Sequence, residues 1–157
     1  RARAPCPAGG RDRPRSGSGR QPAASAAAVA GAGDARGDAV LAFLSERHLG
    51  TLTTLRPDGT PHVVPVGFSY DADAHIVRII TARSSRKAAN IAGDPRVAVS
   101  QLDRGRWLTL EGTAVVTDEE GRVAEAERRY GERYQAPRPR NDRVAIELRV
   151  TRILGRA

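Results

Sequence analysis

Apolar and polar residues alternate along most of the chain after residue 48, which is the pattern of strands with one buried face. Turn signals separate these stretches. In Arg56-Pro57-Asp58-Gly59, for example, the proline presets φ and the glycine accepts a positive φ. The pattern predicts six strands, over residues 49–55, 60–70, 75–81, 96–102, 107–117 and 143–154.

Helical spacing replaces this alternation in three short segments, and each one begins with a residue type that commonly caps helices. The segments cover residues 38–48, 84–93 and 118–134. Their expected N-caps are Asp38, then Ser84 or Ser85, and finally Asp118.

The order of elements, α-β-β-β-α-β-β-α-β, predicts the fold class. Six closely spaced and mostly antiparallel strands indicate a mainly β protein, built as a small closed or half-closed barrel with three short flanking helices. The predicted domain, residues 37–157, is modest in size. Domains of this size often bury further apolar area by association, so we expect a homodimer.

Residues 1–36 differ in composition from the rest of the chain. They consist mainly of Arg, Ala, Gly, Pro and Ser without periodicity, which predicts a disordered tail. Residues 23–33 resemble a weak signal-peptide core, but they contain one Val and no Leu, Ile or Phe. We therefore expect a cytoplasmic protein, with a signal or transit segment as the alternative. No stretch is long and apolar enough to span a bilayer, so we expect no membrane partner.

The net charge of +8 lies mostly in this tail, which holds seven arginines and two aspartates. A basic arm can bind nucleic acid, but this one has no aromatic residue to stack on bases, and we expect no nucleic-acid partner. Cys6 is the single cysteine and the three histidines are scattered, so we expect no disulfide and no metal.

The clearest candidate for chemistry is the run 84–90 (SSRKAAN), where a predicted strand gives way to a helix. The first N–H groups of a helix are free and the dipole is positive there, so an anion is favoured. Arg86 offers a planar fork to phosphate oxygens and Lys87 a compact cation. Lys87 is the only lysine among 26 basic residues, which favours a phosphate site over a merely solvated helix start.

The other candidate site residues each have two interpretations. Trp107, the sole tryptophan, could stack on a planar cofactor, or fill the barrel or the dimer seam. Arg138 and Arg140, with Arg143, could hold substrate carboxylates or belong to an exposed loop.

The chain has no nucleotide-binding glycine fingerprint, Walker-type loop, serine elbow or obvious carboxylate pair. We therefore expect no catalytic side chain; in an enzyme, an organic cofactor would carry the reaction.

Three stretches, taken in order, resemble the pyridoxamine 5'-phosphate oxidase-like split β-barrel superfamily, also called the FMN-binding split barrel. They are LAFLSERHLGTLTTLRPDGTPHVVPVGFSYD, HIVRIITARSSRKAANIAGDPRVAVSQ and RWLTLEGTAVV. The chain is most similar to the deazaflavin (F420)-dependent branch, especially the actinobacterial F420H2-dependent biliverdin reductases. The resemblance covers about residues 38–155.

This resemblance implies a six-stranded split β-barrel that works as a homodimer, with coenzyme F420 in a groove at the interface. It also implies hydride transfer from reduced deazaflavin to a conjugated small molecule such as biliverdin, giving bilirubin. Arg138 and Arg140 become candidate substrate-binding residues. The implied cofactor-binding residues are His62, Val63, Val64, Pro65, Val66, Thr81, Ser84, Ser85, Arg86, Lys87, Asn90 and Trp107.

Two alternatives stay open at this point. FMN also presents a phosphate and a tricyclic ring, so the choice of F420 rests on the resemblance alone. A non-enzymatic protein that binds flavin or pigment is the other alternative. Vitamin B6 oxidation is disfavoured, because true pyridoxamine phosphate oxidases carry a C-terminal W-x-x-x-R-L-x-P segment, and this chain ends in VTRILGRA.

Overall fold

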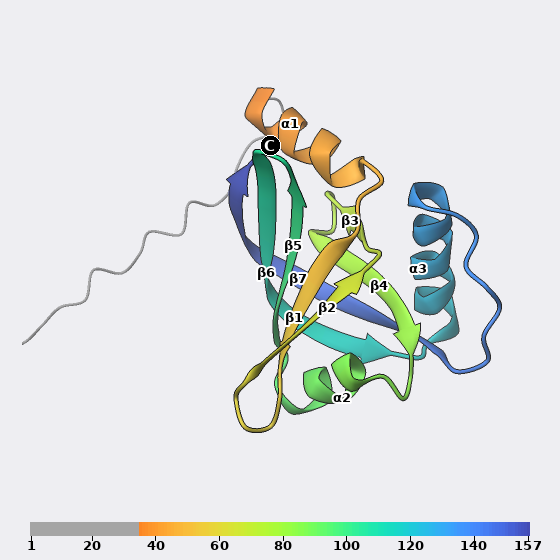
Figure 1. Ribbon diagram of the computed structural model, residues 1–157. Helices are drawn as coiled ribbons and strands as arrows, with labels where there is room; N and C mark the ends of the chain where they lie inside the picture. The colour runs from red at the N-terminus through yellow and green to blue at the C-terminus, as the bar shows by residue number, and fades with distance from the viewer. Residues whose placement is uncertain (1–34) are drawn as a thin grey trace, which may run out of the picture.

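The computed structural model describes residues 35–157, which form seven strands and three helices (Figure 1). The helices are α1 (Ala35–Ser45), α2 (Arg86–Gly93) and α3 (Glu120–Arg133). The strands are β1 (Gly50–Leu55), β2 (Pro61–Val66), β3 (Ser69–Asp71), β4 (Ile76–Ala82), β5 (Arg96–Asp103), β6 (Arg106–Thr117) and β7 (Arg143–Arg156).

All seven strands belong to one antiparallel sheet in the order β2-β1-β5-β6-β7-β4-β3. The sheet is strongly curved, and β2 and β3 form its edges (Figure 1). Helix α2 lies across one end of the barrel, α1 lies at the other end, and α3 packs beside β3, β4 and β7. The fold is therefore mainly β with three helices, as the sequence predicted.

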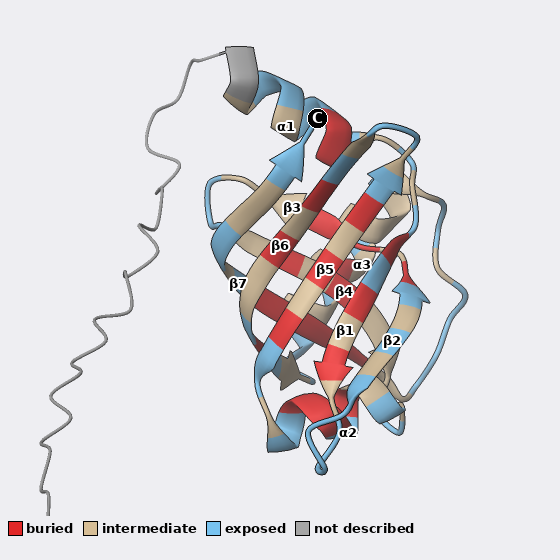
Figure 2. Ribbon diagram, turned by 60° about the vertical axis from the view of Figure 1, so that its left-hand side comes forward, coloured by how far each residue is buried: buried red, intermediate tan, exposed pale blue. Residues whose placement is uncertain are grey.

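Buried residues alternate with more exposed ones along β5 and β6, and the buried set forms one core inside the curved sheet (Figure 2). The long pair β6–β7 bends at a bulge between Glu111 and Gly112. A Cβ atom at Gly112 would lie 1.9 Å from the carbonyl oxygen of Arg149, so the bulge requires glycine.

The predicted count of six strands is wrong, because the expected strand 60–70 is two strands, β2 and β3. The break falls at Gly67 and Phe68. The N–H of Phe68 donates to Oη of Tyr134 at 3.2 Å, and its carbonyl accepts from Arg133 at 2.6 Å. Both backbone groups of Phe68 thus bond to α3 and its C-cap rather than to a neighbouring strand.

Two predicted helix caps are also wrong. Helix α1 begins at Ala35, which leaves Asp38 in its first turn, and Glu119 occupies the N-cap position of α3. The carboxylate of Asp118 instead lies 2.8 Å from Arg83. Ser85 caps α2, as one of the two predicted options. Residues 1–34 of the predicted tail lie outside the described residues.

Strand β7 departs from the burial that its alternating polarity suggests. Five consecutive residues, Val144, Ala145, Ile146, Glu147 and Leu148, are buried. Helix α3 covers the outer face, where Arg122 donates to Glu147 and Arg78 lies 3.4 Å from the same carboxylate. The carboxylate of Glu147 is therefore stabilised by ion pairs with arginines rather than by water.

None of the helices in residues 35–157 is long and apolar enough to cross a membrane. The predicted homodimer stays a prediction.

Arg133, at the end of α3, joins four parts of the fold. Its guanidinium donates to the carbonyl oxygens of Glu46, after α1, and Phe68, between β2 and β3. It also donates to Oε1 of Gln101 on β5 at 2.6 Å, and it lies over the Phe68 ring, 4.3 Å from the centroid. Burial lowers the pKa of Arg133. These neutral acceptors therefore stabilise a charge that is partly removed from water.

We predict that Arg133→Lys destabilises the fold by about 2–4 kcal/mol, because an ammonium cannot reach three separated acceptors and leaves some of them unpaired. Urea unfolding followed by circular dichroism measures the change. Arg128→Lys is the matched control on the same helix, since among residues 35–157 Arg128 pairs only with Glu125 and Glu132, on the exposed surface. Equal stability of the two variants would contradict the role assigned to Arg133.

Candidate anion-binding site at the start of helix α2

The turn between β4 and α2 is organised by the side chain of Ser85. Its Oγ accepts the N–H of Ala88 at 3.4 Å and the hydroxyl of Thr81 at 3.2 Å. Because Ser85 accepts both bonds, its own hydroxyl proton remains available to a ligand. The N–H groups of Arg86 and Lys87, in the first turn of the helix, have no acceptor within it. The start of α2 is therefore rich in hydrogen-bond donors.

A pocket of about 640 Å³ opens beside this helix start. Its walls come from the end of β2, the end of β4, helices α2 and α3, and the segment that joins α3 to β7. The lining residues are Pro65, Val66, Gly67, Ile80, Thr81, Ala82, Ser85, Lys87, Tyr130, Gln135, Ala136, Pro137, Arg138, Arg140 and Arg143.

Positive charge dominates this pocket. Four cationic side chains line it, and no Asp or Glu from residues 35–157 does. Arg140 is paired with Asp142 through two contacts of 2.9 and 3.0 Å, and Arg143 is paired with Glu127. Lys87 and Arg138 have no carboxylate partner within the described part of the chain. The pocket therefore carries two positive charges that the described residues do not offset.

Lys87 is half-buried, and this burial lowers its pKa. A cation that loses water without gaining a counter-ion is destabilised, and a bound anion would relieve that cost. The Lys87 side chain, the Ser85 hydroxyl and the helix dipole all favour the same kind of ligand. The site is chemically suited to a phosphate or carboxylate group.

Comparisons with known proteins agree with this fold. The sequence profile of the family described as Pyridoxamine 5'-phosphate oxidase matches residues 37–157. The chain belongs to this family.

A relative from Mycobacterium tuberculosis (strain CDC 1551 / Oshkosh), named F420H(2)-dependent biliverdin reductase, is 52% identical over 120 residues, which are 76% of this chain and 88% of the relative. A conserved hypothetical protein of Mycobacterium tuberculosis has a solved structure with a TM-score of 0.66 and 25% identity, over 74% of this chain and 81% of that one. The structure of an F420 reductase gives a TM-score of 0.59 and 28% identity, over 72% and 94% of the two chains.

The structure brings together about half of the site residues predicted for this family member. Pro65, Val66, Thr81, Ser85 and Lys87 line the pocket. So do the predicted substrate residues, Arg138 and Arg140.

The other predicted residues lie outside the pocket walls. Ser84 and Arg86 are exposed beside the helix start. Asn90 is 3% exposed and donates to Oγ1 of Thr54 at 2.9 Å, so its side chain joins α2 to β1. On β2, Val63 is exposed and Val64 packs against the core, while Nδ1 of His62 lies 3.4 Å from Oγ1 of Thr54.

Trp107 lies far from the pocket within one chain. It pairs with Arg156 at the end of β7, whereas Arg143, at the start of β7, lines the pocket. Its side chain is 42% exposed. A contact between Trp107 and a ligand in the pocket would therefore have to come from a partner chain, as the sequence-based prediction allowed.

Two pocket residues that meet across the fold were not among the predicted site residues. Tyr130 lies in the predicted helix 118–134 and Gly67 in the predicted strand 60–70. A Cβ atom at Gly67 would lie 2.6 Å from Cε2 of Tyr130, so glycine permits this close approach. No sequence signal links the two positions, because the contact depends on how α3 packs against the β2–β3 connection.

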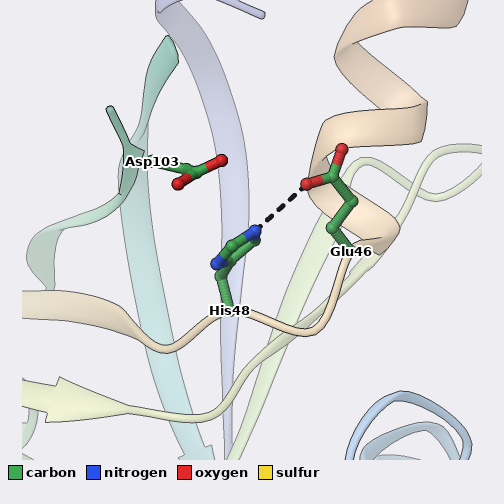
Figure 3. Close-up of side chains that lie close together, drawn as sticks. All are labelled: Glu46, His48 and Asp103. Atoms are coloured by element: carbon green, nitrogen blue, oxygen red, sulfur yellow. Dashed lines mark hydrogen bonds and ion pairs between the residues drawn. The ribbon is translucent and has the colours of Figure 1, made fainter. Parts of the chain in front are cut away.

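A group of ionisable side chains, Glu46, His48 and Asp103, gathers at the α1 end of the barrel (Figure 3). Their possible ligand atoms lie within 4.8 Å of one another. Arg106 already donates to both carboxylates, at 2.6 Å to Oε1 of Glu46 and 2.6 Å to Oδ2 of Asp103. The group is thus an ion-pair cluster centred on arginine.

We predict that Arg106→Ala shifts the titration of Glu46. The pKa of Glu46 is lowered from 4.5 to about 2, chiefly by the hydrogen bond from Arg106 and to a smaller extent by His48. A lowered pKa means that the pair stabilises the fold above pH 4.5, and that this contribution is lost as the pH falls through about 2. In the variant, the pKa should return toward 4.5 in carboxyl-detected NMR.

Asp58 provides the internal control, because its pKa is lowered mainly by hydrogen bonds from Thr60 and should not change in this variant. A Glu46 pKa that stays near 2 without Arg106 would refute the assignment.

Proposed function

We propose that this chain is an F420-dependent oxidoreductase that reduces biliverdin to bilirubin. The observation that carries the proposal is the 52% identity to a protein named F420H(2)-dependent biliverdin reductase, over 88% of that protein. The 28% identical F420 reductase structure supports the more general part of this proposal, the use of F420 as cofactor. The cationic pocket supports a cofactor that bears a phosphate.

The residues present fit such a cofactor. Lys87 and the hydroxyl of Ser85 would hold its phosphate at the start of α2, and Arg86 would add a second cation from the exposed side. The apolar wall made by Pro65 and Val66 would border the ring, with Thr81 beside it. When bound in reduced form, F420 supplies a hydride.

Biliverdin becomes bilirubin by gaining a hydride at its central methine carbon and a proton. We assign no side chain as nucleophile or obligatory acid, and water can deliver the proton because the pocket is open. Arg138, which has no carboxylate partner in residues 35–157, would hold a propionate of the substrate. Arg140 would contact the same propionate only if its ion pair with Asp142 were broken.

We also propose a cytoplasmic homodimer. The apolar side chains exposed on the sheet support association, since Leu102 and Trp107 lie opposite each other on β5 and β6 and are 68% and 42% exposed. In a dimer, the Trp107 ring of one protomer would reach the pocket of its partner.

Removing the cations at the start of α2 should weaken cofactor binding. We expect Lys87→Ala to raise the dissociation constant for F420 at least about tenfold, and Lys87→Ala with Arg86→Ala about a hundredfold, since each charge-assisted contact contributes about 1.5–3 kcal/mol. Fluorescence titration with oxidised F420 measures both constants.

The unfolding midpoint of Lys87→Ala should not fall, because no carboxylate in the described residues loses its partner. Arg96→Ala is the matched control at the other end of α2, where Arg96 pairs with Asp94. If the double variant binds F420 as tightly as the wild type, the phosphate does not bind here.

The choice of cofactor and substrate can be tested directly with the purified protein. We expect F420 to bind more tightly than FMN, and biliverdin to be reduced with F420H2 but not with NADPH or reduced FMN. Absorbance of bilirubin records the turnover. A yellow protein that retains FMN through purification would favour an FMN enzyme of the same fold, and tight biliverdin binding without turnover would favour a pigment-binding protein.

A further inference from the structure

Arg143, the first residue of β7, lines the pocket but is almost removed from solvent. Its side chain is 8% exposed. Nε lies 2.5 Å from Oε1 of Glu127 on α3, in an ion pair without hydrogen-bond alignment. Nη2 donates to the backbone carbonyl oxygen of Arg138. The charge of Arg143 is therefore offset, and one of its donors is already used.

These contacts make Arg143 a junction of three pocket walls. Its backbone pairs with Ala82 at the end of β4, its Nε contacts α3, and its Nη2 holds the 135–142 segment. The segment has one further backbone anchor beside the pocket, where the N–H of Arg83 donates to the carbonyl oxygen of Asp142 at 2.8 Å. The position of the Arg138 backbone thus depends on the buried guanidinium of Arg143.

We infer that Arg143 is a positioning residue, which fixes the 135–142 segment over the pocket and so sets where Arg138 meets a carboxylate of the substrate. The inference rests on the proposed function for the identity of that substrate. This inference gives the three neighbouring arginines different roles: Arg138 contacts the ligand, Arg140 is paired with Asp142, and Arg143, at the start of β7, holds the backbone of the segment.

Holding the segment in this way requires the planar guanidinium of arginine. A guanidinium can contact Glu127 and the Arg138 carbonyl with different nitrogens at once, whereas an ammonium is a compact point charge. Arg143→Lys therefore keeps the positive charge beside Glu127 but loses the link to the segment. The same substitution at Arg149, an exposed residue of β7 outside the pocket, is the matched control.

The test is a double-mutant cycle on biliverdin binding, with the protein saturated by oxidised F420 so that no turnover occurs. We expect Arg138→Gln to weaken biliverdin binding about tenfold and Arg143→Lys about fivefold. The double variant should stay within about twofold of Arg138→Gln alone, because Arg143 acts through Arg138. Binding of F420 should change less than about twofold in all variants.

Two results would overturn the inference. In one, the effects of the two substitutions multiply, which would mean that Arg143 acts independently of Arg138. In the other, hydrogen exchange of the Arg83 amide is as slow in Arg143→Lys as in the wild type and in Arg149→Lys. We expect this exchange to be at least about tenfold faster in Arg143→Lys, because the amide bonds to the segment that Arg143 holds.

The exchange measurement needs no ligand. If the wild-type protein bound no biliverdin, the proposed function would fail, and the exchange rate of the Arg83 amide would still decide whether Arg143 positions the segment.

Discussion

The attachment of α3 to the barrel is the constraint on which the pocket depends. Arg133 and Tyr134 bond to the backbone of Phe68, which lies in the break between β2 and β3. The same packing brings Tyr130 against Gly67 and forms one wall of the pocket. Because the acceptors of Arg133 are neutral, its partly buried charge needs all of them for stabilisation. The position of α3, the break between β2 and β3, and this pocket wall therefore depend on one another.

Another wall of the pocket is formed by residues at the start of α2. Ser85 caps the helix and is itself held by Thr81, which fixes the direction of the first N–H groups. Lys87 is half-buried there without a carboxylate from residues 35–157. Other cations, such as Arg47, Arg104 and Arg149, also lack a carboxylate partner among the described residues, but they are exposed to water. The partial burial of Lys87 without such a partner distinguishes it from them and favours an anionic ligand in this pocket.

The sequence predicted what short-range patterns determine. Alternation located the sheet, and the serine–cation run located the start of α2 and Lys87. The break at Phe68 was missed, because it is caused by side chains 65 and 66 residues away. Arg143 was grouped with Arg138 and Arg140 by spacing alone, whereas in the structure its side chain is buried and paired with Glu127. Asn90 fitted a ligand motif, but its helical position turns it toward Thr54.

The central claim is that an anion of the cofactor binds at the start of α2, against Lys87 and Ser85. A crystal structure of the protein with F420 tests this most directly. We expect a phosphate oxygen within about 3 Å of Nζ of Lys87 and of Oγ of Ser85, the distance of a charge-assisted hydrogen bond. A phosphate bound elsewhere, with Lys87 still without an anionic partner, would contradict it.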